Sequence, residues 1–371
     1  MIPITRPLVG EEEVQAAAAV IRSGWLTQGA KVEEFERAVA GYVGARHAVA
    51  TSSCTAALHL ALLAAGVGEG DDVICPSFSF VATANAIVQA GARPVFVDIE
   101  PSSLNLDPNL VEAAITSRTR CIMPVDQLGL AADLEAIGQI ARRCALPVVE
   151  DAAPAIGATV GRRRVGSIST FTCFSFHPRK AITTGEGGII TTDDEAVANR
   201  LKSLRSHGAS TSDLARHGSA APQFEEYCEP GFNYRMTDIQ AAIGLVQLGR
   251  LEGILAERRR LALRYNRLLS GFVVTPRDIS GRSHTFQSYC VRLPDASRRL
   301  AVMKHLAARG VATRRGVMAI HMEQAYRSTS GSPSLPETER AAADGLLLPL
   351  FPGMGDNAQD EVVAALVEAL T

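Results

Sequence analysis

The sequence lacks several features that would point to particular classes of protein. It has no basic excess, because 37 Lys and Arg are set against 39 Asp and Glu, which gives a formal net charge of −2. That balance gives no support for binding to nucleic acid or to an anionic membrane. It also has no uncharged apolar run of about 18 residues, which a membrane-spanning helix would need. Any anionic ligand must therefore be met by local groups.

The seven cysteines include no Cys-x-x-Cys pair. An odd number of thiols, most of them in apolar surroundings, predicts reduced and buried side chains rather than a disulfide framework or a zinc site. Residues 1–13 lack the charged and apolar regions of a signal peptide. We therefore expect a soluble, cytoplasmic protein with no metal site.

The 371 residues are too many for one small core and predict a large α/β domain followed by a smaller domain. Over residues 48–150, short strand-like runs alternate with helical patterns, which is typical of a parallel sheet covered by helices. We expect the large domain over residues 1–255 and the small domain over residues 256–371. Separate helices are expected on the two sides of this boundary, at 239–248 and 251–269.

Further elements are expected in the second half of the chain. The apolar runs at 285–293 and 312–318 predict strands of the small domain. The polar, turn-rich residues 209–230 and 328–334 predict loops, and the first of these is long enough to form a lid.

Polar groups follow several of the predicted strands. Residues 51–55 (Thr-Ser-Ser-Cys-Thr) lead from a short strand into a helix rich in alanine and leucine. Free backbone N–H groups and the helix dipole can make such a turn an anion site, although Ser and Thr are also common N-caps. Asp151 ends a buried run, where a carboxylate needs either a helix N-terminus or a cation as its partner. Because ligands of parallel sheets bind beyond the carboxyl ends of strands, we expect these groups to converge.

Lys180 lies between the apolar run 171–176 and the glycine-rich turn 185–188. Flanking apolar residues would lower the pKa of its amine towards the neutral form, which can form a Schiff base with an aldehyde. The glycines would let the backbone approach a ligand closely. The alternative is a solvated lysine in an ordinary loop between two strands.

A desolvated lysine, a hydroxyl-rich turn at a helix N-terminus and an aspartate at a strand end together suit pyridoxal 5'-phosphate (PLP). Lys180 would carry the cofactor, residues 51–55 would bind its phosphate, and Asp151 would keep its ring nitrogen protonated so that the ring withdraws electrons. Each feature is weak by itself, and their order and spacing favour this cofactor.

The chain resembles the DegT/DnrJ/StrS family of PLP-dependent sugar aminotransferases nearly from end to end. The segments that carry the resemblance are Ser23-Gly24-Trp25-Leu26-Thr27, Phe35-Glu36, Ser53-Cys54-Thr55-Ala56-Ala57-Leu58, Asp151-Ala152-Ala153, Ser175-Phe176 with Lys180, Gly185-Glu186-Gly187-Gly188 and Gly231-Phe232-Asn233-Tyr234-Arg235-Met236. The resemblance implies an α/β, fold-type I (aspartate aminotransferase-like) scaffold, with a mostly parallel central sheet and a smaller C-terminal α/β domain.

The resemblance also implies roles for the cofactor-binding residues. Lys180 is implied as the Schiff-base lysine and proton shuttle, Asp151 as the partner of the pyridine nitrogen, and Phe80 as the aromatic ring stacked on the cofactor. Phosphate contacts are implied for Cys54, Thr55, Ser175 and Asn233. Of these, the asparagine comes from the neighbouring subunit, which implies a homodimer with shared active sites.

Three residues are implied to lie near the substrate: Trp25, His177 and His321. For Trp25, a core anchor is the alternative interpretation, and for His177 it is a packing residue before Pro178. The N-terminal segment 1–30 is implied to contribute to the active site.

The implied reaction is a ping-pong amino transfer through the Lys180 Schiff base. An amino donor, most often glutamate in the family, leaves the cofactor as pyridoxamine 5'-phosphate (PMP), and a nucleotide-linked keto sugar then takes the amine. One alternative is a keto-cyclitol or another ketone without a nucleotide. Another PLP reaction, such as dehydration or a desulfuration using Cys228, and a non-catalytic regulatory or binding protein are further alternatives.

Four positions depart from the family pattern. Cys54 stands where Gly is usual, Asp126 where many members have His, and Pro154 where Gln or His is usual, while Ala30 replaces a common Pro. Proline cannot donate a hydrogen bond, so a usual contact to the cofactor edge is expected to be missing at residue 154.

Overall fold

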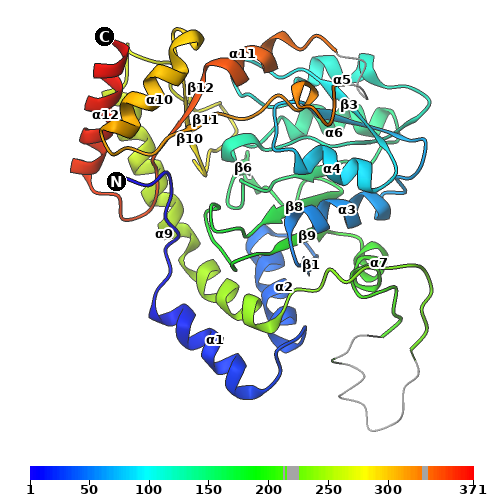
Figure 1. Cartoon of the computed structure of the whole chain (residues 1–371). Coiled ribbons are helices and arrows are strands. Elements are labelled where there is room, and N and C mark those ends of the chain that lie inside the picture. The colour runs from blue at the N-terminus through cyan, green and yellow to red at the C-terminus, as the bar shows by residue number, and fades with distance from the viewer. Residues whose placement is uncertain (212–213, 215–224, 328–332) are drawn as a thin grey trace.

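The structure is a computed structural model that describes residues 1–211, 214, 225–327 and 333–371 (Figure 1). The strands of its large sheet are β1 (His47–Thr51), β2 (Asp72–Pro76), β3 (Arg93–Val97), β4 (Thr119–Ile122), β5 (Val149–Asp151), β8 (Phe171–Ser175) and β9 (Gly188–Thr192). The order β3-β2-β4 continues into β5-β8-β9-β1 through the parallel bridges Ile122–Val148 and Val125–Asp151. Only β9 runs antiparallel to its neighbours in this sheet, so the predicted mostly parallel sheet is confirmed.

Helices cover both faces of this sheet. Successive strand residues point to opposite sides, and apolar residues on both sides need a partner to pack against. Ala50, Ile74 and Phe174 pack with one group of helices: α2 (Ala30–Val43), α5 (Pro108–Ala114), α6 (Leu134–Arg143) and the first part of α9 (Asp238–Leu268). Val49 and Cys173 pack with the other: α3 (Cys54–Ala64), α4 (Ala82–Gln89) and α7 (Glu195–Arg205). Every residue of β2, β8 and β9 is therefore buried, as expected for a sheet enclosed on both faces.

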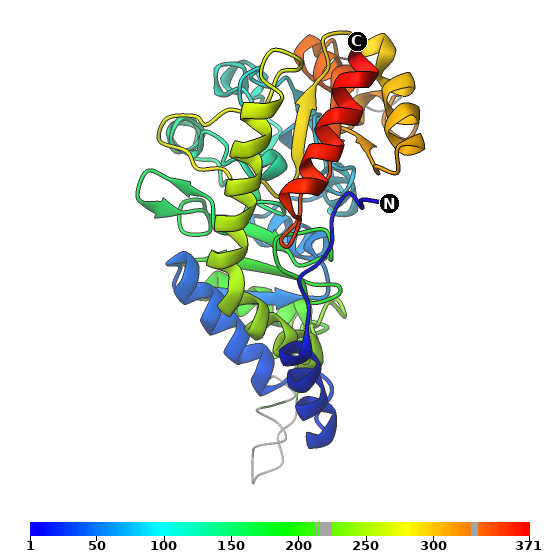
Figure 2. The same ribbon diagram turned by 90° about the vertical axis from the view of Figure 1, so that its left-hand side faces the viewer.

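The small domain has an antiparallel sheet of its own, with the order β10 (Tyr289–Arg292), β12 (Gly345–Leu348), β11 (Arg314–Arg315). It packs with α10 (Arg299–Ala308), α12 (Asp356–Leu370) and the last part of α9 (Figure 2). The N-terminal segment joins it before α1 (Glu11–Ser23), because Ile2 N–H donates to the Gly310 carbonyl at 2.7 Å and Leu350 N–H donates to the Ile4 carbonyl at 3.2 Å. The remaining elements are α11 (Pro336–Asp344), β6 (Thr159–Val160), β7 (Arg163–Arg164) and the 3₁₀ turns η1 (Gln127–Gly129), η2 (Ala296–Arg298) and η3 (Ile320–Met322).

One continuous helix, α9, replaces the two helices predicted at 239–248 and 251–269. Gly249 is the only helix breaker at the expected junction, and a single glycine costs only about 1 kcal/mol. Ala241 before that glycine and Leu255 after it both pack in the sheet cluster, and Leu261 packs in the small-domain cluster, so the helix is anchored on both sides of Gly249. We propose that the two domains divide between residues 255 and 261 of this helix.

Among the described residues, α9 is also the one helix that is long and apolar enough to span a membrane by length and composition. The central helix of a folded core meets the same criterion. Because α9 packs against α1 and α2 and enters both apolar clusters, it is such a core helix.

The predicted small-domain strands are shorter than the apolar runs suggested. β10 begins only at Tyr289, because Thr285 Oγ1 donates to the carbonyls of Gly129 and Pro154 and ties residues 284–287 to the large domain. β11 is confined to Arg314 and Arg315. Of the predicted loops, residues 212–213, 215–224 and 328–332 lie outside the described part of the chain.

Candidate active site

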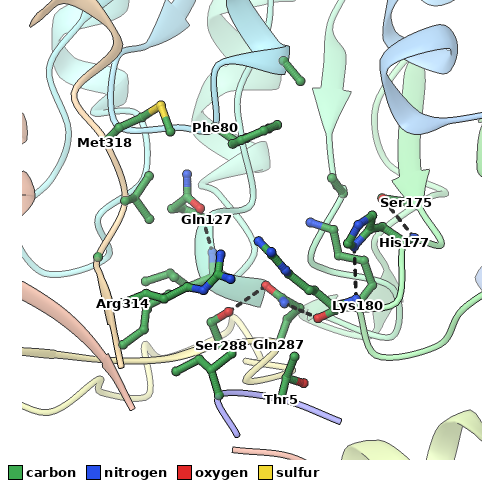
Figure 3. A pocket seen from close by; sticks show the side chains of 18 of the residues that line it. Thr5, Phe80, Gln127, Ser175, His177, Lys180, Gln287, Ser288, Arg314 and Met318 are labelled. Carbon is green, nitrogen blue, oxygen red and sulfur yellow. Dashed lines mark hydrogen bonds between the residues drawn. The ribbon is translucent and has the colours of Figure 1, made fainter. Parts of the chain in front are cut away.

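A cavity of about 830 Å³ opens where β1, β5 and β8 end. The large domain contributes the turn after β1, the end of β5 and the segment after β8. The small domain lines the opposite side with residues of β10, β11 and β12, and Thr5 of the N-terminal segment joins them (Figure 3). The predicted convergence of polar groups at the carboxyl ends of the strands is therefore observed, and the small domain encloses them.

Lys180 is held by a tight turn that follows β8. Its backbone N–H donates to the His177 carbonyl at 2.8 Å, and Thr184 N–H donates to the carbonyl of the fully buried Phe176 at 3.0 Å. Burial lowers the pKa of Lys180, while the carboxylate of Asp151 opposes this by favouring the charged amine. The turn thus presents an amine that is drawn towards its neutral, nucleophilic form.

Asp151 ends β5 and is buried beneath the cavity. Thr83 Oγ1 donates to Asp151 Oδ2 at 2.7 Å, and Ala153 N–H donates to Oδ1 at 3.2 Å. Because a carboxylate only accepts, Thr83 uses its single proton there, and Ser79 Oγ must donate to Thr83 Oγ1 at 2.7 Å. Burial raises the pKa of Asp151, but Thr83 and the nearby Lys180 lower it. This arrangement suits a carboxylate that faces a cation.

The turn before α3 forms another side of the cavity. Ser53 caps the helix, because its Oγ accepts from Ala56 N–H at 3.1 Å, and the next two residues, Cys54 and Thr55, line the cavity. A Cβ atom on Gly188 would lie 2.5 Å from the Ser53 carbonyl, so only glycine lets β9 start against this turn. The first N–H groups of a helix have no intrahelical acceptor, which makes the turn suited to an anion.

These groups match PLP in their chemistry. The cavity offers an amine for the aldehyde, a carboxylate for the ring nitrogen, and helix N–H groups for the phosphate. Ser175, at the end of β8, adds a hydroxyl to the lining next to this turn.

Phe80 and His177 also line the cavity, as the sequence led us to expect. The Phe80 side chain is 65% exposed, so its ring is free to cover a flat ligand. His177 Nδ1 accepts from Arg179 N–H at 3.2 Å, and its Nε2 lies 4.0 Å from a Glu186 carboxylate oxygen. Burial lowers the pKa of His177, and Glu186 opposes this shift.

Trp25 and Asn233 do not line this cavity. Trp25 Nε1 donates to the Gln28 carbonyl at 3.2 Å, in the loop between α1 and α2. Asn233 is exposed and pairs with Ser206 in an antiparallel bridge. Within one chain, the structure therefore keeps both residues away from Lys180.

His321 is also outside the cavity lining, contrary to the position expected from the sequence. It is buried, with Nδ1 2.7 Å from Ser77 Oγ and its backbone N–H donating to the same oxygen at 3.0 Å. Its Nε2 lies 3.4 Å from Glu339. These contacts on both ring nitrogens orient His321 into the packing behind the loop that follows β2.

Among the lining residues that the sequence interpretation missed are Thr83, Gln127, Gln287 and Arg314. Gln287 Nε2 donates to the Arg179 carbonyl at 2.6 Å, which ties the small-domain side of the cavity to the lysine turn. Arg314 projects into the cavity opposite Lys180 (Figure 3). Its guanidinium makes no hydrogen bond or ion pair with any described residue. The Arg314-Arg315 pair was the only sequence signal for this cationic side.

One departure from the family pattern, Cys54, lines the cavity, and another, Pro154, follows the lining residue Ala153. Burial raises the pKa of Cys54, so this position presents a neutral thiol to the cavity. Pro154 is buried, and only its carbonyl is used, as an acceptor from Thr285 Oγ1 at 3.1 Å. No side-chain donor reaches the cavity from residue 154.

Comparison with known proteins gives matches over nearly the whole chain. The model of the DegT/DnrJ/EryC1/StrS aminotransferase family matches residues 7–367. The spore coat polysaccharide biosynthesis protein SpsC of Bacillus subtilis (strain 168) is 38% identical over 373 residues, which covers 98% of this chain and 96% of SpsC.

Solved structures give the same result. Helicobacter pylori PseC, an aminotransferase involved in the biosynthesis of pseudoaminic acid, superposes with a TM-score of 0.93 at 26% identity, covering 100% of this chain and 99% of PseC. NtdA from Bacillus subtilis with bound PMP superposes with a TM-score of 0.87 at 31% identity, covering 98% of this chain and 83% of NtdA.

Proposed function

The chain belongs to the DegT/DnrJ/EryC1/StrS aminotransferase family, and from this premise we propose that it transfers an amino group from glutamate to a nucleotide-linked keto sugar. It is a PLP-dependent aminotransferase, like the family as a whole. The observation that carries the proposal is that the half-buried amine of Lys180 and the carboxylate of Asp151 line one cavity that also has a helix N-terminus on its wall.

The cofactor would be held by residues that already line the cavity. Cys54, Thr55 and Ser175 would bind the phosphate, Asp151 the ring nitrogen, and Phe80 one face of the ring. When bound, PLP supplies an aldehyde that joins covalently to amines and a ring that withdraws electrons from the adjacent carbon. Asp151 would support that withdrawal by remaining charged, which Thr83 and Lys180 favour by lowering its pKa.

Lys180 Nζ would serve as both general base and general acid. Its lowered pKa leaves a larger fraction of neutral amine at neutral pH, so the amine can take a proton from the donor carbon and return it to the neighbouring centre. The small-domain residues that enclose the cavity would exclude water from this transfer, which strengthens the electrostatic contact with Asp151.

An anionic donor and acceptor are supported by the charges around the cavity. Arg179, Arg314 and Arg315 line it with Lys180, against the carboxylates of Asp151 and Glu186. Arg315 is paired with Glu323 at 3.2 Å, whereas Arg314 has no such partner within the described ranges. A guanidinium with free donors binds carboxylate and phosphate well, which suits glutamate and a nucleotide diphosphate. The names of SpsC and PseC support a sugar as the acceptor.

The proposal includes a homodimer in the cytoplasm. Asn233 is exposed and lies outside the cavity of its own chain, so it would contact the cofactor phosphate of a partner subunit. Trp25 would likewise lie near the substrate of the partner's site. Two copies would then be needed to complete each active site.

The test is the visible absorption spectrum of the purified protein with PLP, before and after glutamate. We expect a band of lysine-bound cofactor that shifts to the PMP form with glutamate. Lys180→Ala should lose both the band and the shift, while Lys304→Ala, at an exposed lysine of α10, should keep both. Absence of a band in the wild type would contradict the assignment of Lys180.

The acceptor is identified by the ketone that returns the PMP form to the PLP form. Nucleotide-linked keto sugars should do so, and the free sugars and keto-cyclitols serve as matched controls. Equal rates with and without the nucleotide would replace the nucleotide sugar with a free ketone as the substrate.

A further inference from the structure

A second pair of carboxyl groups lies directly behind Asp151, and the proposed chemistry does not use it. Asp126 follows β4 and Glu150 precedes Asp151 in β5, and both side chains are completely buried. The Asp126 backbone N–H donates to the Asp151 carbonyl at 3.0 Å, so the pair is fixed next to the carboxylate that faces the cavity.

Each of these carboxyl groups has one oxygen with a donor and one without. Asp126 Oδ1 accepts from Ala132 N–H at 2.8 Å, and Glu150 Oε2 accepts from Thr172 Oγ1 at 2.8 Å. The other two oxygens, Asp126 Oδ2 and Glu150 Oε1, are buried and have no donor group in the described part of the chain. The two side chains are nevertheless within hydrogen-bonding reach of each other. Two carboxylates only accept, so a single proton between them would satisfy both oxygens.

We propose that Asp126 carries a proton and donates it to Glu150, so that the buried group of Asp126, Glu150 and Asp151 holds two negative charges instead of three. The proton is assigned to Asp126 because Glu150 accepts from the hydroxyl of Thr172 at 2.8 Å, which stabilises its charged form, whereas Asp126 accepts from the backbone N–H of Ala132. Asp151 is not the carrier, since both of its oxygens have donors.

The consequence reaches the cavity through Asp151, and it rests on the role proposed for that residue. A third negative charge beside Asp151 would raise its pKa and draw a proton onto it, and a neutral Asp151 could not hold a ring cation. With the proton on Asp126, Asp151 remains the charged group that faces the cavity. Asp126 is therefore a positioning residue: it touches neither substrate nor cofactor, but the proton that it carries keeps Asp151 negatively charged.

The other titratable groups around the pair do not supply a competing cation. Asp151 faces it from β5 and Cys173 faces Glu150 from β8, where burial raises the pKa of the thiol and keeps it neutral. Lys180 acts on Asp151, whose pKa it lowers. Burial, followed by the neighbouring Glu150, raises the pKa of Asp126.

Infrared difference spectroscopy tests the proposal on the wild type and Asp126→Asn at pH 7, with carbon-13-labelled aspartate. The wild type should show a protonated-carboxyl band that shifts with the label and disappears in Asp126→Asn, whose amide can donate to Glu150 instead. Asp151→Asn should retain the band. Asp193→Asn, at an exposed carboxylate that accepts from Arg46 N–H, should lose only carboxylate bands. No labelled protonated band in the wild type, or one lost only in Asp151→Asn, would overturn the assignment.

Urea unfolding across pH gives a second measurement. Because the folded pKa of Asp126 is raised, its stabilising proton is present at low pH and is lost as pH rises through the folded pKa. Between the ordinary aspartate pKa of about 4 and that value, the unfolding constant of the wild type should rise about tenfold per pH unit relative to Asp126→Asn. Parallel pH profiles would contradict the shared proton.

The experiments distinguish a failure of the shared-proton proposal from a failure of the proposed PLP function. If Asp126→Asn does not fold, the question is decided by the labelled band of the wild type and by whether Asp151→Asn retains it. The band does not require cofactor, so it would survive a failure of PLP to bind, whereas loss of the band would leave the Lys180 assignment intact.

Discussion

The charge of Asp151 depends on burial and on three neighbouring groups. Burial raises the pKa of Asp151, while Thr83, Lys180 and the backbone N–H of Ala153 lower it. Removing any one of these contacts should therefore change how the site responds to pH.

Thr83→Val removes the hydroxyl donor to Asp151 and also leaves Ser79 without its acceptor. The pKa of Asp151 should rise further, so PLP binding should weaken by about tenfold, consistent with about 1–3 kcal/mol for a buried unsatisfied group. The loss should grow as pH falls, because more Asp151 is then protonated. Absorbance titration with PLP between pH 5 and 8 measures this. Thr83→Ser keeps the hydroxyl and should bind like the wild type, and equal binding by both variants would refute the role of the hydroxyl.

Arg314→Gln removes the cation that faces Lys180 across the cavity. If Arg314 binds the carboxylate of glutamate, KM for glutamate should rise about tenfold or more with little change in kcat, because a charge-assisted hydrogen bond is worth about 1.5–3 kcal/mol. Steady-state kinetics measure the two constants separately. The control Arg260→Gln removes only an exposed ion pair with Asp356 at 3.0 Å. An unchanged KM for glutamate in Arg314→Gln would leave the nucleotide diphosphate as the partner of Arg314.

At the scale of elements, two glycines are needed for different reasons or not at all. Comparing them distinguishes the effect of close packing from the effect of helix propensity. Gly188 starts β9 against the α3 turn, whereas Gly249 lies in α9, where a Cβ atom would meet no heavy atom within 4 Å. The same substitution should therefore have opposite effects at the two positions.

Gly188→Ala should displace the α3 turn, because its Cβ would come within 2.6 Å of Ser53 and Cys54 backbone atoms. We expect destabilisation by a few kcal/mol and loss of PLP binding, measured by thermal unfolding and absorbance titration. Gly249→Ala should stabilise the protein by about 0.5–1 kcal/mol and leave PLP binding unchanged. Similar unfolding temperatures for the two variants would contradict the close approach of β9 to the turn.

The segment that carries Gln287 should make the protein sensitive to acid. His284 is buried, stacks on Phe286 with ring centroids 4.0 Å apart, and accepts from Phe286 N–H at Nδ1. Burial, helped by nearby Arg259, lowers the pKa of His284 to about 3. The unfolded chain takes up a proton below a pKa of about 6.5, so the folded state loses stability as pH falls from 6.5 towards 3.

His284→Asn keeps an acceptor for Phe286 N–H but does not titrate. Between pH 6.5 and pH 5, the wild type should lose about 2 kcal/mol of unfolding free energy relative to this variant, because each pH unit is worth about 1.4 kcal/mol. Urea denaturation at several pH values measures the difference. Equal acid sensitivity would indicate that His284 has the same pKa in the folded and unfolded protein, which would contradict the shift.

The sequence anticipated the elements whose signal is local. Lys180, Asp151 and the turn at Cys54 each follow an apolar strand, and the strand ends of a parallel sheet bring them together. Arg314 was missed because its strand has only two residues, which is too short for a periodic pattern. The sequence did not show that His321 stays out of the cavity lining, because its hydrogen bonds reach Ser77, 244 positions away in the chain. Such long-range partners leave no trace in local spacing.

At the scale of the whole molecule, one chain contains Lys180 and Asp151 but keeps Asn233 away from them. If the sites are shared, the activity of a dimer that combines two inactive variants can be calculated. A dimer of Lys180→Ala with Asn233→Ala has one site with both defects and one site with none.

Co-refolding equal amounts of Lys180→Ala and Asn233→Ala should therefore restore about a quarter of the wild-type activity, because half of the dimers are mixed and each has one intact site. The glutamate half-reaction measures the recovery, and each variant refolded alone is the control. No recovery despite mixed dimers, detected through a tag on one variant, would mean that Asn233 serves its own chain.

The helix α9 belongs to both domains, because its first part packs against the large sheet and its last part packs in the small-domain core. At 1.5 Å per residue, its 31 residues span about 46 Å without a break. Arg258, a buried residue of α9, donates to the carbonyls of Phe286, Gln287 and Leu350 and so links the cavity wall to this helix. Any closing movement of the small domain over the substrate would therefore strain α9, which belongs to the cores of both domains, together with the contacts of Thr285 with the Gly129 and Pro154 carbonyls.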